Sequence, residues 1–141
     1  PGLFAWWREN STKPNIVSFH APEPVALLTA AATKANVRYA ITTYYAENRM
    51  QGHLFPRRLD AYIRPADLSA MRVGVLAAGG QLGGSNFRLW MRDDHVTQEA
   101  HQSAGPAPMW YAPAAQVILD LYQEGGSAAE AADMLVKTAY A

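Results

Sequence analysis

The residue types that could bind a metal ion gather in one polar segment of this 141-residue chain, which contains Asp93, Asp94, His95, Glu99 and His101. Neutral imidazoles together with a carboxylate suit zinc or a non-haem metal. In an extended segment His95, Glu99 and His101 would share one face, because the side chains of a strand alternate with a period of two. The segment lies outside any apolar framework and lacks a third well-spaced ligand. We therefore expect a solvated loop and assign no metal ligands.

A second candidate is a glycine-rich segment formed by Gly79, Gly80, Gly83 and Gly84. A phosphate-binding fingerprint needs a strand, then glycines, then a helix, so that amides at the helix N-terminus meet the phosphate. Here the glycines follow an expected helix and precede an expected strand, and no Gly-Lys-Ser/Thr follows them. We expect a helix end and a connecting turn.

Nucleophilic catalysis has little support in the residue inventory. The chain has no cysteine, which excludes disulfides, thiol catalysis and cysteine-ligated metal centres. No G-x-S-x-G elbow is present, and the serines have explanations as helix caps or turn residues. We assign no catalytic residue and expect no cofactor.

The layout of a metal-dependent nucleotidyltransferase is partly present. Such an enzyme uses a small-residue turn after a strand and two or three carboxylates on a nearby strand. In this chain Thr42 and Thr43 stand at the turn, and Asp60 on the next strand has no acidic neighbour two residues away. One carboxylate cannot hold two metal ions, so a related scaffold would lack catalysis. We expect Asp60 to be a solvated strand residue.

The arginines are the remaining group of polar residues that could bind a ligand. The candidates for nucleic-acid contact are Arg49, Arg57, Arg58 and Arg64. Arginine beside tyrosine could contact phosphate with aromatic support. Alternatively, these arginines pair with nearby carboxylates on a neutral surface. Twelve basic residues balance twelve acidic ones, so the formal net charge is zero. That balance argues against a strong unspecific polyanion binder, although not against a local basic patch.

The adjacent Trp6 and Trp7 point to a contact outside the domain. On a helix, neighbouring side chains point about 100° apart, so both indoles are not expected to face one interior. We expect one of them to pack against an upstream segment or a partner. Numbering starts at Pro1 without a methionine, which suggests that more chain lies upstream. No signal-peptide or membrane-spanning pattern is present, and we expect a cytoplasmic protein.

These side chains would be positioned by alternating strands and helices. We expect strands at residues 16–20, 37–42, 58–63 and 87–91, and helices at 24–35, 44–52, 68–80 and 113–124. Pro24 and Asn36 should mark the ends of the first of these helices, and Val117, Ile118 and Leu121 should form the buried stripe of the last. A final helix should start at Ser127 with Glu130 in a capping box, after an irregular segment at 93–113 that holds one or two short strands. The fold class is a mixed α/β (α+β) domain, with a single small sheet, flanking helices and a C-terminal helical pair. We divide the chain into residues 1–18, an upstream linker and first strand, and residues 19–141, the domain itself.

Taken in order, these segments resemble the C-terminal domain of the AbiEi-type antitoxins, which are transcriptional regulators of type IV toxin–antitoxin systems. The resemblance rests on the stretches FHAPEPVALLTAAA, VRYAITTYYAENRMQG, RLDAYIRPADLSAM, NFRLWMRDD and YAPAAQVILDLYQEGGSAAEAADML. The last is the most similar. The family usually has Thr-Gly where this chain has Thr42–Thr43, so the turn after that strand departs from the pattern.

The resemblance implies a non-enzymatic bacterial repressor domain that acts with an upstream winged-helix DNA reader. It implies DNA as a partner, and no catalytic residue is carried over from the family. Two alternatives stay open. One is a degenerate nucleotidyltransferase-like domain that still binds a nucleotide, and the other is an interaction module that forms a homodimer through Trp6 or Trp7 and the C-terminal helices.

Overall fold

A computed structural model describes residues 15–92, 95–103 and 108–140 of the chain, so Trp6, Trp7, Asp93 and Asp94 lie outside the described residues. The strands are β1 (Asn15–His20), β2 (Ala40–Thr42), β3 (Leu59–Ile63), β4 (Gln81–Leu82), β5 (Phe87–Met91), β6 (His101–Gln102) and β7 (Trp110–Tyr111). The helices are α2 (Pro24–Ala35), α3 (Thr43–Met50), the 3-10 turn η1 (Pro65–Asp67), α4 (Leu68–Ala77), α5 (His95–Gln98), α6 (Ala114–Glu124) and α7 (Gly126–Tyr140). The expected mixed α/β class is confirmed.

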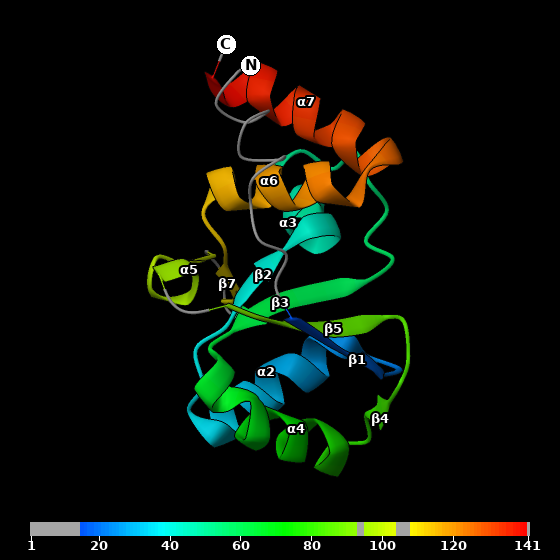
Figure 1. Ribbon diagram of the computed structural model, residues 1–141, viewed down its shortest axis with the longest axis vertical. Coiled ribbons are helices and arrows are strands. Elements are labelled where there is room, and N and C mark those ends of the chain that lie inside the picture. Colours follow the sequence, from blue (N-terminus) through cyan, green and yellow to red (C-terminus); the bar gives the residue numbers. More distant parts are fainter. Residues whose placement is uncertain (1–14, 93–94, 104–107, 141) are drawn as a thin grey trace.

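All the described strands join one seven-stranded mixed sheet, in the order β4-β1-β5-β3-β2-β7-β6 (Figure 1). The central strand β3 runs parallel to β5 and antiparallel to β2. Strand β1 pairs with β4 on one side and β5 on the other, both antiparallel. The expected boundary between residues 18 and 19 therefore falls inside β1, and residues 15–18 belong to the same sheet as the rest of the domain.

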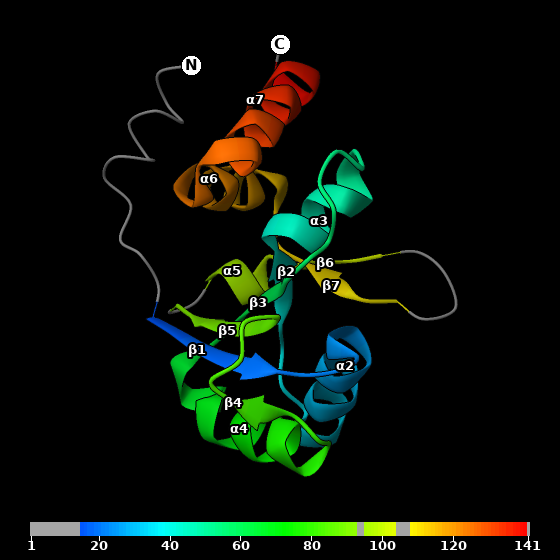
Figure 2. The same cartoon turned by 90° about the vertical axis from the view of Figure 1, so that its right-hand side faces the viewer.

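Helices cover both faces of this sheet. Helices α2 and α4 lie on one face, α3 and α6 lie on the other, and α7 packs outside α6 (Figures 1 and 2). All five residues of β3 are buried as a result, including Asp60 with no exposed surface. The expectation that Asp60 is solvated is wrong, because the face of β3 that carries its polar residues is covered by helices.

Close packing between backbone segments depends on two glycines. In α4, a Cβ at Gly74 would lie 3.1 Å from the Cβ of Ala31, so glycine lets α4 approach α2. At Gly84, a Cβ would lie 2.3 Å from the backbone nitrogen of His20, at the end of β1. The glycine-rich segment includes β4, which pairs with β1, and Gly84 is the glycine of this segment that lies against β1, whereas a Cβ at Gly80 would meet the side chain of Val75.

The first two helices show which local signals operate. Helix α2 begins at Pro24 and ends at Ala35, and the residue that follows it, Asn36, has a φ of 54° in the left-handed region, as the sequence predicts. Strand β2 is shorter than expected, and α3 begins directly at Thr43. No side-chain cap bond forms there, because the threonine hydroxyls at this junction donate to distant carboxylates instead.

The C-terminal helical pair is confirmed, with one correction at its junction. Val117, Ile118 and Leu121 form the expected buried stripe of α6. Helix α7 begins at Gly126, and the amides of Ala128 and of the residue after it donate to the carbonyl of Gly125. The residue expected to cap α7, Ser127, therefore lies inside its first turn, and the capping box with Glu130 is wrong. None of the described helices is both long and apolar enough to cross a membrane.

Candidate polar site at the junction of β2, α3 and β3

Two consecutive threonines at the start of α3 direct their hydroxyls to two buried carboxylates. Thr42 Oγ1 donates to Asp120 Oδ2 over 2.6 Å, and Thr43 Oγ1 donates to Asp60 Oδ2 over 2.5 Å. Thr43 has a φ of 50°, which is a strained, left-handed conformation for a β-branched residue. The two hydroxyls hold this junction against β3 and α6 at once.

Asp60 is one half of a buried ion pair with Arg58. The guanidinium donates through Nε to Asp60 Oδ1 over 2.8 Å and through Nη2 to Oδ2 over 2.6 Å. The same Nη2 lies 2.9 Å from Glu124 Oε1 at the end of α6. Burial raises the pKa of Asp60, and the guanidinium opposes that rise. Burial alone would lower the pKa of Arg58, but the bonds and charges of Asp60 and Glu124 outweigh it and raise that pKa.

Asp120 on α6 anchors a second network, on which the charge of Arg92 acts from 5.9 Å above the Tyr62 ring. Tyr62 donates its hydroxyl to Asp120 Oδ1 over 2.7 Å, and Gln116 Nε2 donates to the same oxygen over 2.9 Å. Burial raises the pKa of Asp120 to about 6, although the donors from Thr42, Tyr62 and Gln116 pull it down. Burial, followed by the neighbouring Asp120, raises the pKa of Tyr62, so its phenol stays protonated and remains a donor. This network fastens α6 to the sheet.

The next strand, β5, places two further donors on the same side of the sheet. Arg88 pairs in register with Asp60, and Trp90 pairs with Tyr62 and packs edge-on against its ring at 5.5 Å. Within the described part of the chain, Arg88 Nε and Trp90 Nε1 are the buried side-chain nitrogens without a hydrogen-bond partner. No local sequence pattern singles out Arg88, because its position beside Asp60 follows from the order of the strands.

The site resembles the layout of a nucleotidyltransferase in one respect. The turn after β2 does meet a carboxylate on the neighbouring strand, as the spacing of Thr43 and Asp60 suggests. Both oxygens of that carboxylate, however, accept hydrogen bonds from Arg58. A metal ion would have to displace the guanidinium to bind Asp60.

The expected metal-capable segment takes a different form. Asp93 and Asp94 lie outside the described residues, and His95 belongs to the helical turn α5. Val96 and Thr97 are buried in this turn, so the expectation of a solvated loop is wrong here, and a helical turn does not place alternate residues on one face. His101 lies in β6, where its ring packs against that of Tyr111 at 6.3 Å. Among the described residues, no group of three or more histidine, aspartate or glutamate side chains is arranged to hold a metal ion.

The four candidate arginines do not share one patch. Arg57 is exposed and donates to the hydroxyl of Tyr44 over 2.8 Å, whereas Arg58 is mostly buried in its ion pairs. Arg49 lies over the ring of Tyr111 at 4.8 Å. Tyr44 and Arg49 are five residues apart on α3, which sets their side chains about 140° apart around the helix.

Arg64 lies apart from the other three. It follows the opposite end of β3 from Arg58, and six residues of extended chain span roughly 20 Å. Its Nε lies 3.1 Å from Asp67 Oδ2 in an exposed ion pair. Asp67 occupies the position before α4 but makes no side-chain cap bond there, since its carboxylate faces Arg64.

Comparison of the chain with protein-family models, with curated proteins and with solved structures finds no match. The likeness to AbiEi-type antitoxins thus depends on the sequence stretches given above.

Proposed function

We propose that this chain is a non-enzymatic domain of a bacterial, cytoplasmic transcriptional regulator of the AbiEi antitoxin type, which acts with a winged-helix DNA reader upstream. The sequence stretches support the family, and the mixed α/β fold with its terminal helix pair agrees with the fold expected from them. In this proposal the described domain contributes binding and not catalysis.

The observation that carries the non-enzymatic role is the position of Arg58. Its guanidinium bonds to both oxygens of Asp60, at the place where a nucleotidyltransferase would hold its metal ions. These are charge-assisted hydrogen bonds, which are about twice as strong as neutral ones. A metal ion would have to replace both of them to reach Asp60, so the pair favours a structural role for this carboxylate.

The connection between α3 and β3 is the surface best suited to phosphate contact. Residues 48–58 contain no acidic residue, and Arg49, His53 and Arg57 are exposed along it. The Arg57 guanidinium lies 4.8 Å from the centre of the Tyr44 ring. This contact restricts the motion of the side chain and does not neutralise its positive charge. We propose that Arg57, and Arg49 on a different side of α3, supply two separate auxiliary contacts to the DNA backbone.

The test is fluorescence anisotropy of the 141-residue chain with labelled duplex DNA, from the regulated promoter and of random sequence, across a salt series. We expect weak binding without sequence preference, and a flatter salt dependence for Arg49→Ala/Arg57→Ala. Arg64→Ala removes an arginine that already pairs with Asp67 and serves as the matched control. Nanomolar, sequence-selective binding by this chain would overturn the proposal that an upstream domain reads the DNA sequence. An equal effect of Arg64→Ala on the salt dependence would overturn the assignment of Arg49 and Arg57 as DNA contacts.

One observation favours a second candidate, a degenerate nucleotidyltransferase-like domain that binds a nucleoside triphosphate. It is the contact between Thr43 and Asp60, which brings the turn after β2 to the carboxylate. Calorimetry with ATP or GTP and Mg²⁺ tests it, and binding at this site must depend on Mg²⁺ and weaken in Thr43→Ala. An absence of heat at millimolar nucleotide rejects this candidate.

A further inference from the structure

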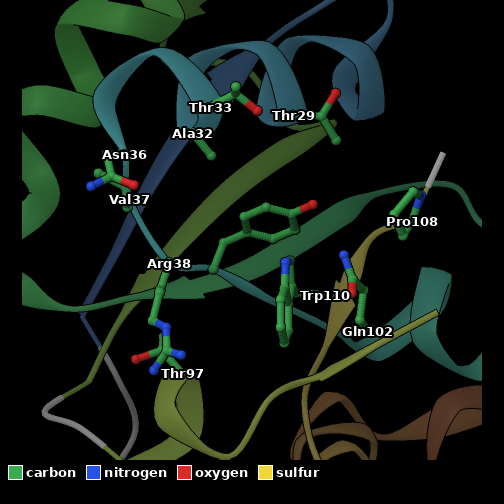
Figure 3. A pocket seen from close by; sticks show the side chains of 11 residues that line it. Thr29, Ala32, Thr33, Asn36, Val37, Arg38, Thr97, Gln102, Pro108 and Trp110 are labelled. Atoms are coloured by element: carbon green, nitrogen blue, oxygen red, sulfur yellow. The ribbon is translucent and has the colours of Figure 1, made fainter.

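A separate pocket of about 410 Å³ opens between the C-terminal half of α2, the chain that leads into β2, and the ribbon of β6 and β7 (Figure 3). Its volume lies in the lower part of the range for small-molecule sites, which suits one ring system with a small substituent. None of its lining residues belongs to the polar site at the junction of β2, α3 and β3.

One wall of this pocket is aromatic. Trp110 and Gln102 are cross-strand partners in β7 and β6, and their side chains stand side by side in the pocket (Figure 3). Trp110 keeps 36% of its surface exposed, which is a large area for an aromatic residue of a sheet. Tyr39, 7% exposed, adds a second ring to the lining. Flat aromatic ligands gain affinity by stacking on such side chains.

The other walls offer hydrogen-bonding groups that are neutral. Thr29 and Thr33 line the pocket from α2, and Asn36 lines it from the end of that helix (Figure 3). In the described part of the chain, the side chains of Thr33, Asn36 and Gln102 make no hydrogen bond to another residue. Amides and hydroxyls both donate and accept, so together they match the polar edge of a heteroaromatic ring.

Among the described residues that line the pocket, Arg38 is the one charged residue, and none of them is an aspartate or a glutamate. Arg38 is exposed and forms no ion pair within residues 15–92, 95–103 and 108–140, and its side chain lies beside Thr97 at one end of the pocket (Figure 3). A free guanidinium binds phosphate through two parallel hydrogen bonds.

We propose that this pocket binds a nucleoside monophosphate. The base stacks on Trp110 with its polar edge towards Gln102 and the threonines of α2, and the phosphate lies at Arg38. The site would make the domain responsive to a small nucleotide. It is independent of the DNA-contact surface and of Asp60, since it shares no residue with either.

Isothermal titration calorimetry of the 141-residue chain tests the proposal with AMP, GMP, CMP and UMP in the absence of Mg²⁺. The corresponding nucleosides and inorganic phosphate are the comparison probes. We expect submillimolar binding of at least one monophosphate, ~tenfold weaker binding of its nucleoside, and no measurable binding of phosphate alone. Failure of all four monophosphates at millimolar concentration would overturn the proposal, as would phosphate that binds as tightly as the nucleotide.

Variants assign the binding to this pocket. Trp110→Ala should abolish it and Trp110→Phe should keep most of it, because a phenyl ring still stacks. Arg38→Ala should weaken monophosphate binding to the level of the nucleoside. The matched control is Arg72→Ala, on the exposed side of α4, which should change nothing. Circular dichroism confirms that each variant folds, and unchanged affinity in folded Trp110→Ala and Arg38→Ala would show that the nucleotide binds elsewhere.

Discussion

The substitution Asp120→Asn should change how the stability of this protein depends on pH. Asp120 is 2% exposed and its pKa is raised from 3.8 to about 6, first by burial and against the donors from Thr42, Tyr62 and Gln116. A carboxyl whose pKa is raised on folding binds its proton more tightly in the folded state. Its contribution to stability is therefore present below the unfolded pKa and is lost as pH rises through the folded pKa.

The magnitude follows from the two pKa values. At about 1.4 kcal/mol per pKa unit, the full difference is about 3 kcal/mol. Between pH 7.5 and pH 5, the part that is recovered is about 1.4 kcal/mol, because the carboxyl is then about nine-tenths protonated in the folded state. Asparagine keeps an acceptor for Tyr62 and Gln116 and does not ionise in this range, so Asp120→Asn removes this contribution.

The assay is urea denaturation of the wild type and of Asp120→Asn at several pH values between 4.5 and 7.5. We expect the unfolding free energy of the wild type to gain about 1.4 kcal/mol more than that of the variant as pH falls from 7.5 to 5. Subtracting the two pH profiles removes the contributions of Asp60 and of the other titrating groups that both proteins share. Asp133→Asn, at an exposed position of α7, controls for the loss of a surface carboxylate. Two outcomes would refute the argument that burial is the main cause of the raised pKa of Asp120. One is parallel pH profiles of stability for the two proteins, and the other is a wild type that loses stability relative to the variant as pH falls.

Three further predictions concern the packing. Arg58→Leu should lower the unfolding free energy by about 3–5 kcal/mol, because Asp60 then stays buried without its cation. Arg64→Ala, which removes an exposed ion pair, should lower it by less than about 1 kcal/mol. Similar losses in the two variants would contradict the buried pair. Thr43→Gly should be more stable than Thr43→Ala by about 1 kcal/mol, because both variants lose the hydrogen bond to Asp60 but glycine adopts the positive φ without strain. Equal melting temperatures for the two variants would show that the conformation of Thr43 is not strained. Leu121→Ala should cost about 2–5 kcal/mol in thermal or urea unfolding, and an unchanged stability would mean that this face of α6 is not core.

Local patterns in the sequence predicted the elements that depend on neighbouring residues. The spacing of Val117, Ile118 and Leu121 identified the buried stripe of α6, and Pro24 and Asn36 marked the two ends of α2. These signals act within one or two turns of chain, so periodicity and backbone preference are sufficient to detect them.

The same patterns misjudged the polar residues of β3. Its alternation of apolar and polar side chains is typical of a strand with one solvated face. Here the second face is covered by α3 and α6, and those helices supply the partners of Asp60 and Tyr62. Alternation of apolar and polar residues indicates that one face of a strand is polar. It does not indicate whether water or another part of the protein forms the hydrogen bonds of that face.

The sequence by itself determined the class of fold and the absence of cysteine chemistry, because composition and local periodicity carry that information. The tertiary structure decided which polar residues meet. Thr42 and Asp120 are 78 positions apart and lie 2.6 Å from each other, and the pocket beside Trp110 draws on α2, α5 and two short strands. Contacts between residues so distant in the chain arise from the order of the strands and the packing of the helices, for which no local pattern in this sequence gives a signal.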